Sequence, residues 1–240
     1  HNVAHSFPTR RSSDLLGPEL GRLADAAKAL NSSRRIDRDR VFQLKHEALR
    51  MLWARRQPTE AMESYRRREG NALEQFATFC VLAQEHGDDW RRWPIEFRRP
   101  DSTAVKSFAK RHAEDIAYHA WLQWLLDEQL ARASQAVSLV QDLPIGFNPG
   151  GADAWAWQDL LAADISIGAP PDAFNMLGQN WRLPPFVPAK LRKAGYEPLI
   201  QTLRAALRNA GGLRIDHVMG LFRLWWIAGG FLGLLALVAL

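Results

Sequence analysis

Cysteine is almost missing from this 240-residue chain, in which Cys80 stands alone. A single cysteine excludes an intrachain disulfide framework and a cysteine-based zinc site. It is typical of a reducing compartment, and the first residues show no basic segment followed by an apolar one. We therefore expect a cytoplasmic protein without a secretory signal. Glycine-rich loops of the kind that bind phosphate or a dinucleotide are missing as well.

Metal-binding patterns are missing too. His46 and Glu47 resemble the start of a zinc-binding helix, but the second histidine of that pattern does not follow, and the other histidines are scattered. A metal-dependent hydrolase is therefore an alternative with little support, and we expect no metal ion or organic cofactor.

Positive charge is in excess, with a formal net charge of +5. The densest basic clusters are residues 66–68, 91–92 and 98–99, and acidic residues lie among them. Such mixing is typical of a solvated surface, so we expect no nucleic-acid partner. The ten tryptophans and eleven phenylalanines are many for this length. Most should fill the core, although aromatic rings also stack on sugars.

Both ends of the chain have an unusual composition. Residues 6–15 resemble a translated sequencing adapter, so we interpret residues 1–15 as an artefact, with a disordered native tail as the alternative. The last seventeen residues, from Leu224 on, carry no charge, which is near the lower limit for a membrane span. We interpret residues 228–240 as a frameshifted apolar tail and do not expect membrane attachment. A membrane anchor and a buried helix are the alternatives.

The middle of the chain divides into two parts by pattern. Residues 16–136 show helical spacing of apolar residues, including helices over 16–30 and 37–56. Residues 137–227 are different: an apolar run at 143–147 reads as a buried strand, and residues 148–188 as a long loop. A helix over residues 198–209 and a strand over residues 213–216 follow. Strand, loop, helix and strand in this order predict an α/β barrel.

Asp216 is the candidate catalytic residue on the last of these strands. Catalytic side chains of α/β barrels lie at the carboxyl ends of the strands, where Asp216 is placed. Arg214, two residues earlier, points to the same side, and a nearby guanidinium would keep the carboxylate ionised, as a nucleophile must be. A structural ion pair is the alternative interpretation.

Four segments, in this order, resemble glycoside hydrolase family 77, the 4-α-glucanotransferases. They are His119–Trp124; Asp142–Gly146 with Ala152–Ala156; Gly168–Asp172 with Phe174, Gly178–Trp181 and Leu183–Pro185; and Gly212–His217 with Gly220 and Trp225–Ile227. The resemblance runs from about Leu16 to Ile227. It implies an incomplete (β/α)8 TIM-type barrel with a helix-rich N-terminal part, and a barrel part over residues 137–227 that holds a glucan-covering loop and the nucleophile strand.

The resemblance also implies a function, transfer of α-1,4-glucan segments between malto-oligosaccharides with glucose or maltose as acceptor. Asp216 would form a covalent glycosyl-enzyme, a second carboxylic acid would protonate the departing oxygen, and a sugar hydroxyl would then take the glycosyl group. Arg214 would assist catalysis. The residues implied to bind substrate are His217, Asp172, Phe174, Gln179 and Trp181. For Phe174 and Trp181, packing within the loop is the alternative.

Two departures from the family stand out. Arg182 occupies a position where the family has glycine. After Ile227 the family continues with Pro-Glu-Gly, and its general acid Glu and a further Asp lie on strands after the nucleophile, whereas this sequence ends first. Since the loss of a general acid costs about 10²–10⁴ in rate, we expect the chain as written to be inactive. A non-catalytic carbohydrate-binding or membrane-tethered fragment is the alternative.

Overall fold

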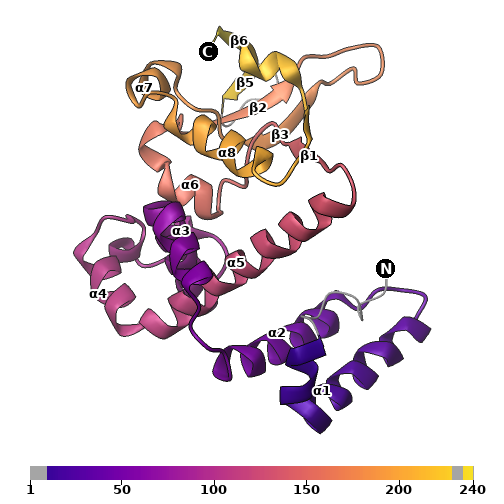
Figure 1. The fold of residues 1–240 in the computed structure, drawn as a ribbon. Coiled ribbons are helices and arrows are strands. Elements are labelled where there is room, and N and C mark those ends of the chain that lie inside the picture. The colour runs from indigo at the N-terminus through magenta and orange to yellow at the C-terminus, as the bar shows by residue number, and fades with distance from the viewer. Residues whose placement is uncertain (1–9, 229–234, 240) are drawn as a thin grey trace. The chain divides into compact units, whose positions relative to one another are not determined.

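The computed structural model of the protein describes residues 10–228 and 235–239 (Figure 1). The chain forms two compact units, residues 1–60 and residues 61–240. Residues 1–9 of the expected artefact, and residues 229–234 and 240 of the expected apolar tail, lie outside the described residues. Among the described residues, no helix has the length and apolar character that crossing a membrane requires.

The first unit is a pair of helices joined by a short turn. The helices are α1 (Arg10–Ala29), interrupted at Gly17, and α2 (Arg38–Ala54), with the 3-10 turn η2 (Leu30–Ser32) between them. The Asp37 carboxylate accepts a hydrogen bond from the backbone N–H of Arg40 at 2.9 Å, which caps α2. Buried Leu23, Leu44 and Ala48 form the core of the pair. The helices expected over residues 16–30 and 37–56 are confirmed within a few residues.

The second unit begins with a helical layer. Its helices are α3 (Glu60–His86), with an irregular residue at Gly70, α4 (Thr103–Arg111) and α5 (Ala113–Ala136). Two 3-10 turns, η3 (Trp90–Arg92) and η4 (Ile95–Phe97), connect α3 to α4. The Ser102 hydroxyl caps α4 by accepting from the backbone N–H of Val105 at 3.1 Å.

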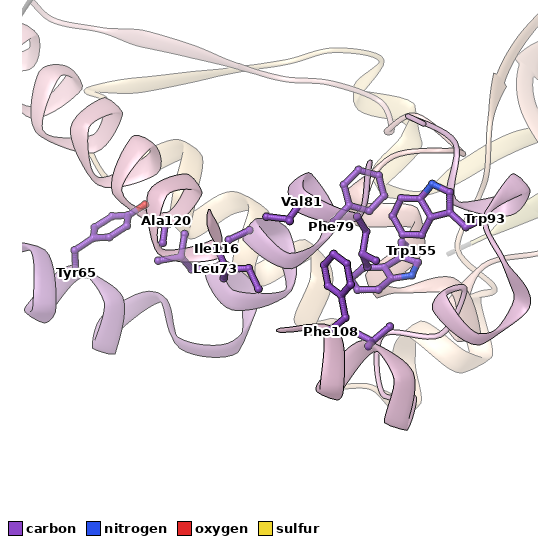
Figure 2. Close-up of a cluster of buried hydrophobic side chains, with 12 residues drawn as sticks. Tyr65, Leu73, Phe79, Val81, Trp93, Phe108, Ile116, Ala120 and Trp155 are labelled. Carbon is purple, nitrogen blue, oxygen red and sulfur yellow. The ribbon is translucent and has the colours of Figure 1, made fainter. Parts of the chain in front are cut away.

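The core of this layer combines aromatic and aliphatic side chains, as Figure 2 shows. Trp93 and Trp155 are both 0% exposed, and their rings meet edge to face with centroids 6.0 Å apart. Each indole N–H is satisfied by a carbonyl: that of Gly87 for Trp93, at 2.7 Å, and that of Phe97 for Trp155, at 3.1 Å. Trp155 follows the helices of this layer in the sequence and belongs to the barrel part of the chain. Its burial in the core of the layer therefore packs the barrel part against the helices.

The strands form two sheets. A parallel pair joins β1 (Val140–Leu143) to β4 (Gly212–Ile215), with Asp142 opposite Arg214 and Leu143 opposite Ile215. An antiparallel sheet has the order β3-β2-β5-β6. Its strands are β2 (Ile165–Ala169), β3 (Gln179–Leu183), β5 (Arg223–Ala228) and β6 (Leu235–Ala239). The remaining elements are α6 (Ala152–Ala156), η5 (Gln158–Leu160), α7 (Pro188–Lys193), α8 (Glu197–Leu207) and η6 (Val218–Leu221).

The expectation of one long loop over residues 148–188 is wrong. This segment holds α6, η5 and the hairpin of β2 and β3. The hairpin strands have five residues each and pair irregularly beside Gly168, so they show no clear alternation of apolar and polar residues. The first expected strand lies earlier than residues 143–147, at Val140–Leu143, because the pairing with β4 ends at Leu143.

Candidate functional site

The site is built at the carboxyl ends of the parallel pair β1 and β4. Asp216 follows the last residue of β4, and its backbone N–H donates to the carbonyl of Leu143 at 3.0 Å, which continues the pairing by one step. The Asp216 side chain lines a cavity of about 200 Å³. Its placement at a strand end thus agrees with the position expected from the sequence.

The wall of this cavity is mostly apolar and comes from many elements. Residues from the segment after β1, from α6, from the segment after β3, from α8 and from η6 line it, among them Ile145, Phe147, Trp157, Pro185, Phe186, Leu199 and Leu221. An apolar wall with few polar groups is the usual composition of a binding site for a small ligand. The polar side chains at the cavity are Asp216, His217, Asp153 and Thr202.

Arg214 has a different carboxylate partner from the one expected. Its guanidinium binds the Asp142 carboxylate through Nε at 2.5 Å and through Nη2 at 2.9 Å. The parallel register places Asp142 directly opposite Arg214, whereas Asp216 lies past the end of the strand. We expected Arg214 to orient Asp216 and keep it ionised. In the described structure, however, Arg214 makes no direct contact with the Asp216 carboxylate. The pair contributes instead to the β1–β4 junction.

This ion pair should be weak. The side chains of Arg214 and Asp142 are 73% and 59% exposed, so solvent screens their attraction. We expect a coupling free energy of about 0.2–1 kcal/mol between Arg214→Ala and Asp142→Ala, measured by denaturant unfolding of both single variants and the double variant. A coupling well above this range would mean that the pair is a main determinant of the strand junction.

His217 and Trp181 are brought together by the fold. His217 has a left-handed backbone with φ of 49°, and its carbonyl accepts from the N–H of Gly220 at 2.7 Å to start η6. Its ring meets the ring of Trp181, on β3, edge to face with centroids 5.1 Å apart. The Trp181 indole N–H donates to Gln179 Oε1 at 3.0 Å. Three of the expected substrate-binding residues are therefore linked, and one of them lines the Asp216 cavity.

The other two expected residues lie at the tip of the hairpin. Asp172 Oδ1 accepts from the backbone N–H groups of Phe174 at 2.8 Å and Asn175 at 2.7 Å, so its carboxylate closes the turn. Phe174 is 98% exposed. In the described part of the chain neither residue lines the Asp216 cavity. The exposure of Phe174 does not agree with the alternative of packing within the loop.

Asp153 is a site residue that the sequence analysis did not single out. It lies on α6 and lines the same cavity as Asp216. Although the residue keeps an exposed surface, burial raises the pKa of its carboxyl group above the ordinary value. A carboxyl with a raised pKa beside a candidate nucleophile is typical of an active site. The signal available in the sequence was its place in the segment Ala152–Ala156, which resembles the family.

The raised pKa of Asp153 has a consequence for stability. Because the folded state holds the proton more tightly than the unfolded state, the ionised carboxylate costs stability above its folded pKa, and this cost disappears as pH falls. We expect Asp153→Asn to raise the melting temperature at pH 7 by on the order of 1–3 °C, a small gain because solvent screens the charge. Thermal unfolding at about pH 3 should show no gain. A lower melting temperature at pH 7 would contradict this account.

Metal ligands are not gathered at this site. Over residues 10–228 and 235–239, no three His, Cys, Asp or Glu side chains are grouped in a way that could hold a metal ion.

Comparisons with known proteins give a consistent result. The model of glycoside hydrolase family 77, described as 4-alpha-glucanotransferase, matches residues 12–231. A 4-alpha-glucanotransferase of Mycobacterium tuberculosis is 48% identical over 207 residues, which cover 81% of this chain and 28% of that protein. A 4-alpha-glucanotransferase of Haemophilus influenzae is 37% identical, over 84% of this chain and 32% of that protein.

Solved structures agree with these relatives. The amylomaltase of Corynebacterium glutamicum superposes with a TM-score of 0.75 and 34% identity, over 91% of this chain and 31% of that chain. The amylomaltase of Streptococcus agalactiae, solved in complex with acarbose, superposes with a TM-score of 0.67 at 18% identity and supports the fold alone. These matches confirm the expected class, a helix-rich α/β part of a TIM-type barrel.

The chain spans between 28% and 32% of the length of these two curated relatives. Within that span the family model covers residues 12–231, which include Asp216 and strands β1 to β5. The chain belongs to glycoside hydrolase family 77, the 4-alpha-glucanotransferase family.

Proposed function

We propose that this chain supplies the nucleophile of a 4-α-glucanotransferase that moves α-1,4-glucan segments between malto-oligosaccharides. The observation that carries the proposal is the place of Asp216, at the carboxyl end of β4 and in the wall of a cavity. Carboxylates at such strand ends perform the chemistry of barrel enzymes. Membership of the 4-alpha-glucanotransferase family supports a carbohydrate substrate.

The reaction proceeds by two displacements at one carbon. The Asp216 carboxylate attacks the anomeric carbon, the bond to the departing sugar oxygen breaks, and that oxygen takes a proton from a carboxylic acid. The family resemblance places this acid on a later strand of the barrel. In the second step the hydroxyl of an acceptor sugar attacks the same carbon and gives its proton to the carboxylate that the first step left, and the bond to Asp216 breaks. Both steps invert the carbon, so its configuration is retained overall.

His217 and Asp153 bind the sugar in this proposal. Both line the cavity that holds Asp216. The edge-to-face contact with Trp181 fixes the His217 ring, so that a ring nitrogen can hydrogen-bond a sugar hydroxyl. Arg214 acts on the site through Asp142 and the β1–β4 junction rather than by touching Asp216. Gln179 holds the Trp181 indole, while Asp172 and Phe174 belong to the turn that shapes the hairpin tip.

Glucose and maltose are the acceptors that we propose, because each offers the 4-hydroxyl that the second step requires. A cytoplasmic location, which the single Cys80 favours, stays a prediction.

The test uses α-maltosyl fluoride, a donor whose fluoride leaves without a proton. Covalent labelling by this donor therefore reports on the nucleophile alone and needs no general acid. We expect the mass of the 240-residue chain to increase by one maltosyl group, with the label on the peptide that contains Asp216. Disproportionation of maltotriose, followed by chromatography, measures complete transfer in parallel.

The results of this test separate the alternatives. Labelling at Asp216 supports the nucleophile assignment whether or not maltotriose is turned over. Binding of maltotriose without labelling would instead identify a non-catalytic carbohydrate-binding chain. Labelling at another carboxylate would contradict the assignment of Asp216.

A further inference from the structure

A second cavity lies outside the site described above. Its volume is about 620 Å³, within the range of about 300–1,000 Å³ that is usual for ligand sites. Its wall comes from η3, from the segment that runs from η5 into β2, and from β3. Among the described lining residues, Pro184 is the one that it shares with the Asp216 cavity. The lining residues used below are Trp90, Arg91, Gln158, Asp159, Asp164 and Arg182.

Trp90 is the aromatic part of this wall. Its indole N–H donates to the carbonyl of Pro149 at 3.0 Å, and its backbone N–H donates to the carbonyl of Gly150 at 3.3 Å. One part of the ring packs against the aromatic core, and the residue is only partly buried. The ring is thus held in place while an uncovered part lines the cavity, as a stacking surface for a sugar requires.

The polar groups around Trp90 are also held in place. Arg91 binds both oxygens of Asp89 at 2.8 Å, through Nε and Nη2, which leaves Nη1 for a ligand. The Gln158 amide donates to the carbonyls of Arg98 and Trp155 at 2.9 and 2.8 Å, which leaves its oxygen as an acceptor. Fixed donors and acceptors beside an aromatic ring suit a ligand rich in hydroxyl groups.

Two other residues at the cavity adopt a strained backbone. Asp164 and Arg182 have φ angles of 53° and 58°, in the left-handed region that favours glycine. Within the described residues, neither Asp164 nor Arg182 takes part in an ion pair, and both line the cavity. Strained residues persist where the surrounding structure holds them, and they concentrate at ligand sites. At Arg182 the strain is notable because the family resemblance places glycine there.

The hairpin strand β3 connects the second cavity to a residue of the first site. Trp181 contacts His217 at the first site, and the next residue, Arg182, lines the second cavity. Neighbouring residues of a strand point to opposite faces, so β3 can hold Trp181 against His217 while Arg182 lines the second cavity.

We propose that this second cavity binds an α-glucan chain outside the transfer site. Trp90 stacks on one glucose ring, while Arg182, Arg91 and Asp164 hydrogen-bond its hydroxyl groups. A neutral sugar fits better than an anion, because the carboxylates of Asp159 and Asp164 accompany the two guanidinium groups in the wall. The choice of α-glucan among sugars rests on the proposed function.

The test is calorimetric titration of the 240-residue chain with maltohexaose. Arg182→Gly removes the side chain at a backbone position that glycine adopts readily, so the fold should persist. Trp90→Phe keeps a ring against the core but reduces the stacking area. We expect Arg182→Gly and Trp90→Phe each to weaken binding at this cavity by roughly five- to tenfold, the loss typical of a central contact residue. Arg132→Ala is the control, since Arg132 is exposed, lies on α5 and lines neither cavity.

Several results would overturn the proposal. Unchanged maltohexaose affinity in both folded variants would do so while leaving glucan recognition at the Asp216 cavity intact. The chain could also bind inorganic phosphate, and Arg182→Gly could abolish this binding while the affinity for maltohexaose stays unchanged. That result would identify the cavity as an anion site instead of a glucan site. If the unmodified chain binds no maltohexaose, the second site is also excluded, and labelling by α-maltosyl fluoride then decides the proposed function separately.

Discussion

Replacement of Asp216 by Asn is expected to reduce covalent labelling by α-maltosyl fluoride by on the order of 10⁴-fold, the loss that removal of a nucleophile usually causes. The amide has nearly the shape of the carboxylate but carries no negative charge, so it cannot displace fluoride from the anomeric carbon. The backbone bond from residue 216 to Leu143 does not involve the side chain and should persist. The measurement is the rate of mass increase of the intact chain, with peptide mapping of the label.

The matched control is Asp88→Asn, which makes the same chemical change at an exposed residue that does not line the Asp216 cavity. It should be labelled at the rate of the unmodified chain. Equal labelling of Asp216→Asn would show that another group is the nucleophile, and the mapped peptide would identify it. Circular dichroism of both variants should be unchanged, because Asp216 is exposed and makes no core contact.

Local sequence patterns predicted much of the fold. Apolar spacing located α1 and α2 within a few residues, and the run before Gly146 and the run after Gly211 indicated the two strands of the parallel pair. Asp216 could be placed at the end of a strand because that position depends on the short segment Gly212–Ile215 alone. These features depend on residues close in sequence, so the sequence is enough to predict them.

Pairings between distant segments could not be predicted in this way. Arg214 was expected to serve Asp216, but its partner is Asp142, 72 residues earlier, and only the register of β1 and β4 reveals it. Asp153 joins the site because α6 packs at the same cavity, not because of a local pattern. The hairpin of β2 and β3 is stabilised by pairing with β5 across almost sixty residues, while its own residues read as a loop.

Gly168 is the residue on which that hairpin depends most. It is buried in β2, between β3 and β5, opposite Asn180 on one side and Trp225 on the other. A Cβ atom at this position would lie 2.0 Å from the carbonyl oxygen of Gln179 and 2.5 Å from Ile227 Cδ1. The nearer of these is a backbone atom, which no change of side-chain rotamer can move. Only separation of β3 from β2 can relieve the overlap.

We therefore expect Gly168→Ala to destabilise the chain by about 3 kcal/mol, at the upper end of the cost of overpacking, and to lower the melting temperature by about 6–12 °C. The rate of amide hydrogen exchange should increase most at β3, where Trp181 would lose its fixed contact with His217. Gly212→Ala is the control, because a Cβ atom there would meet Val140 Cγ2 at 3.5 Å, an ordinary contact in the other sheet. If both variants melted together, the close approach of β2 and β3 would not be what holds the hairpin beside the nucleophile.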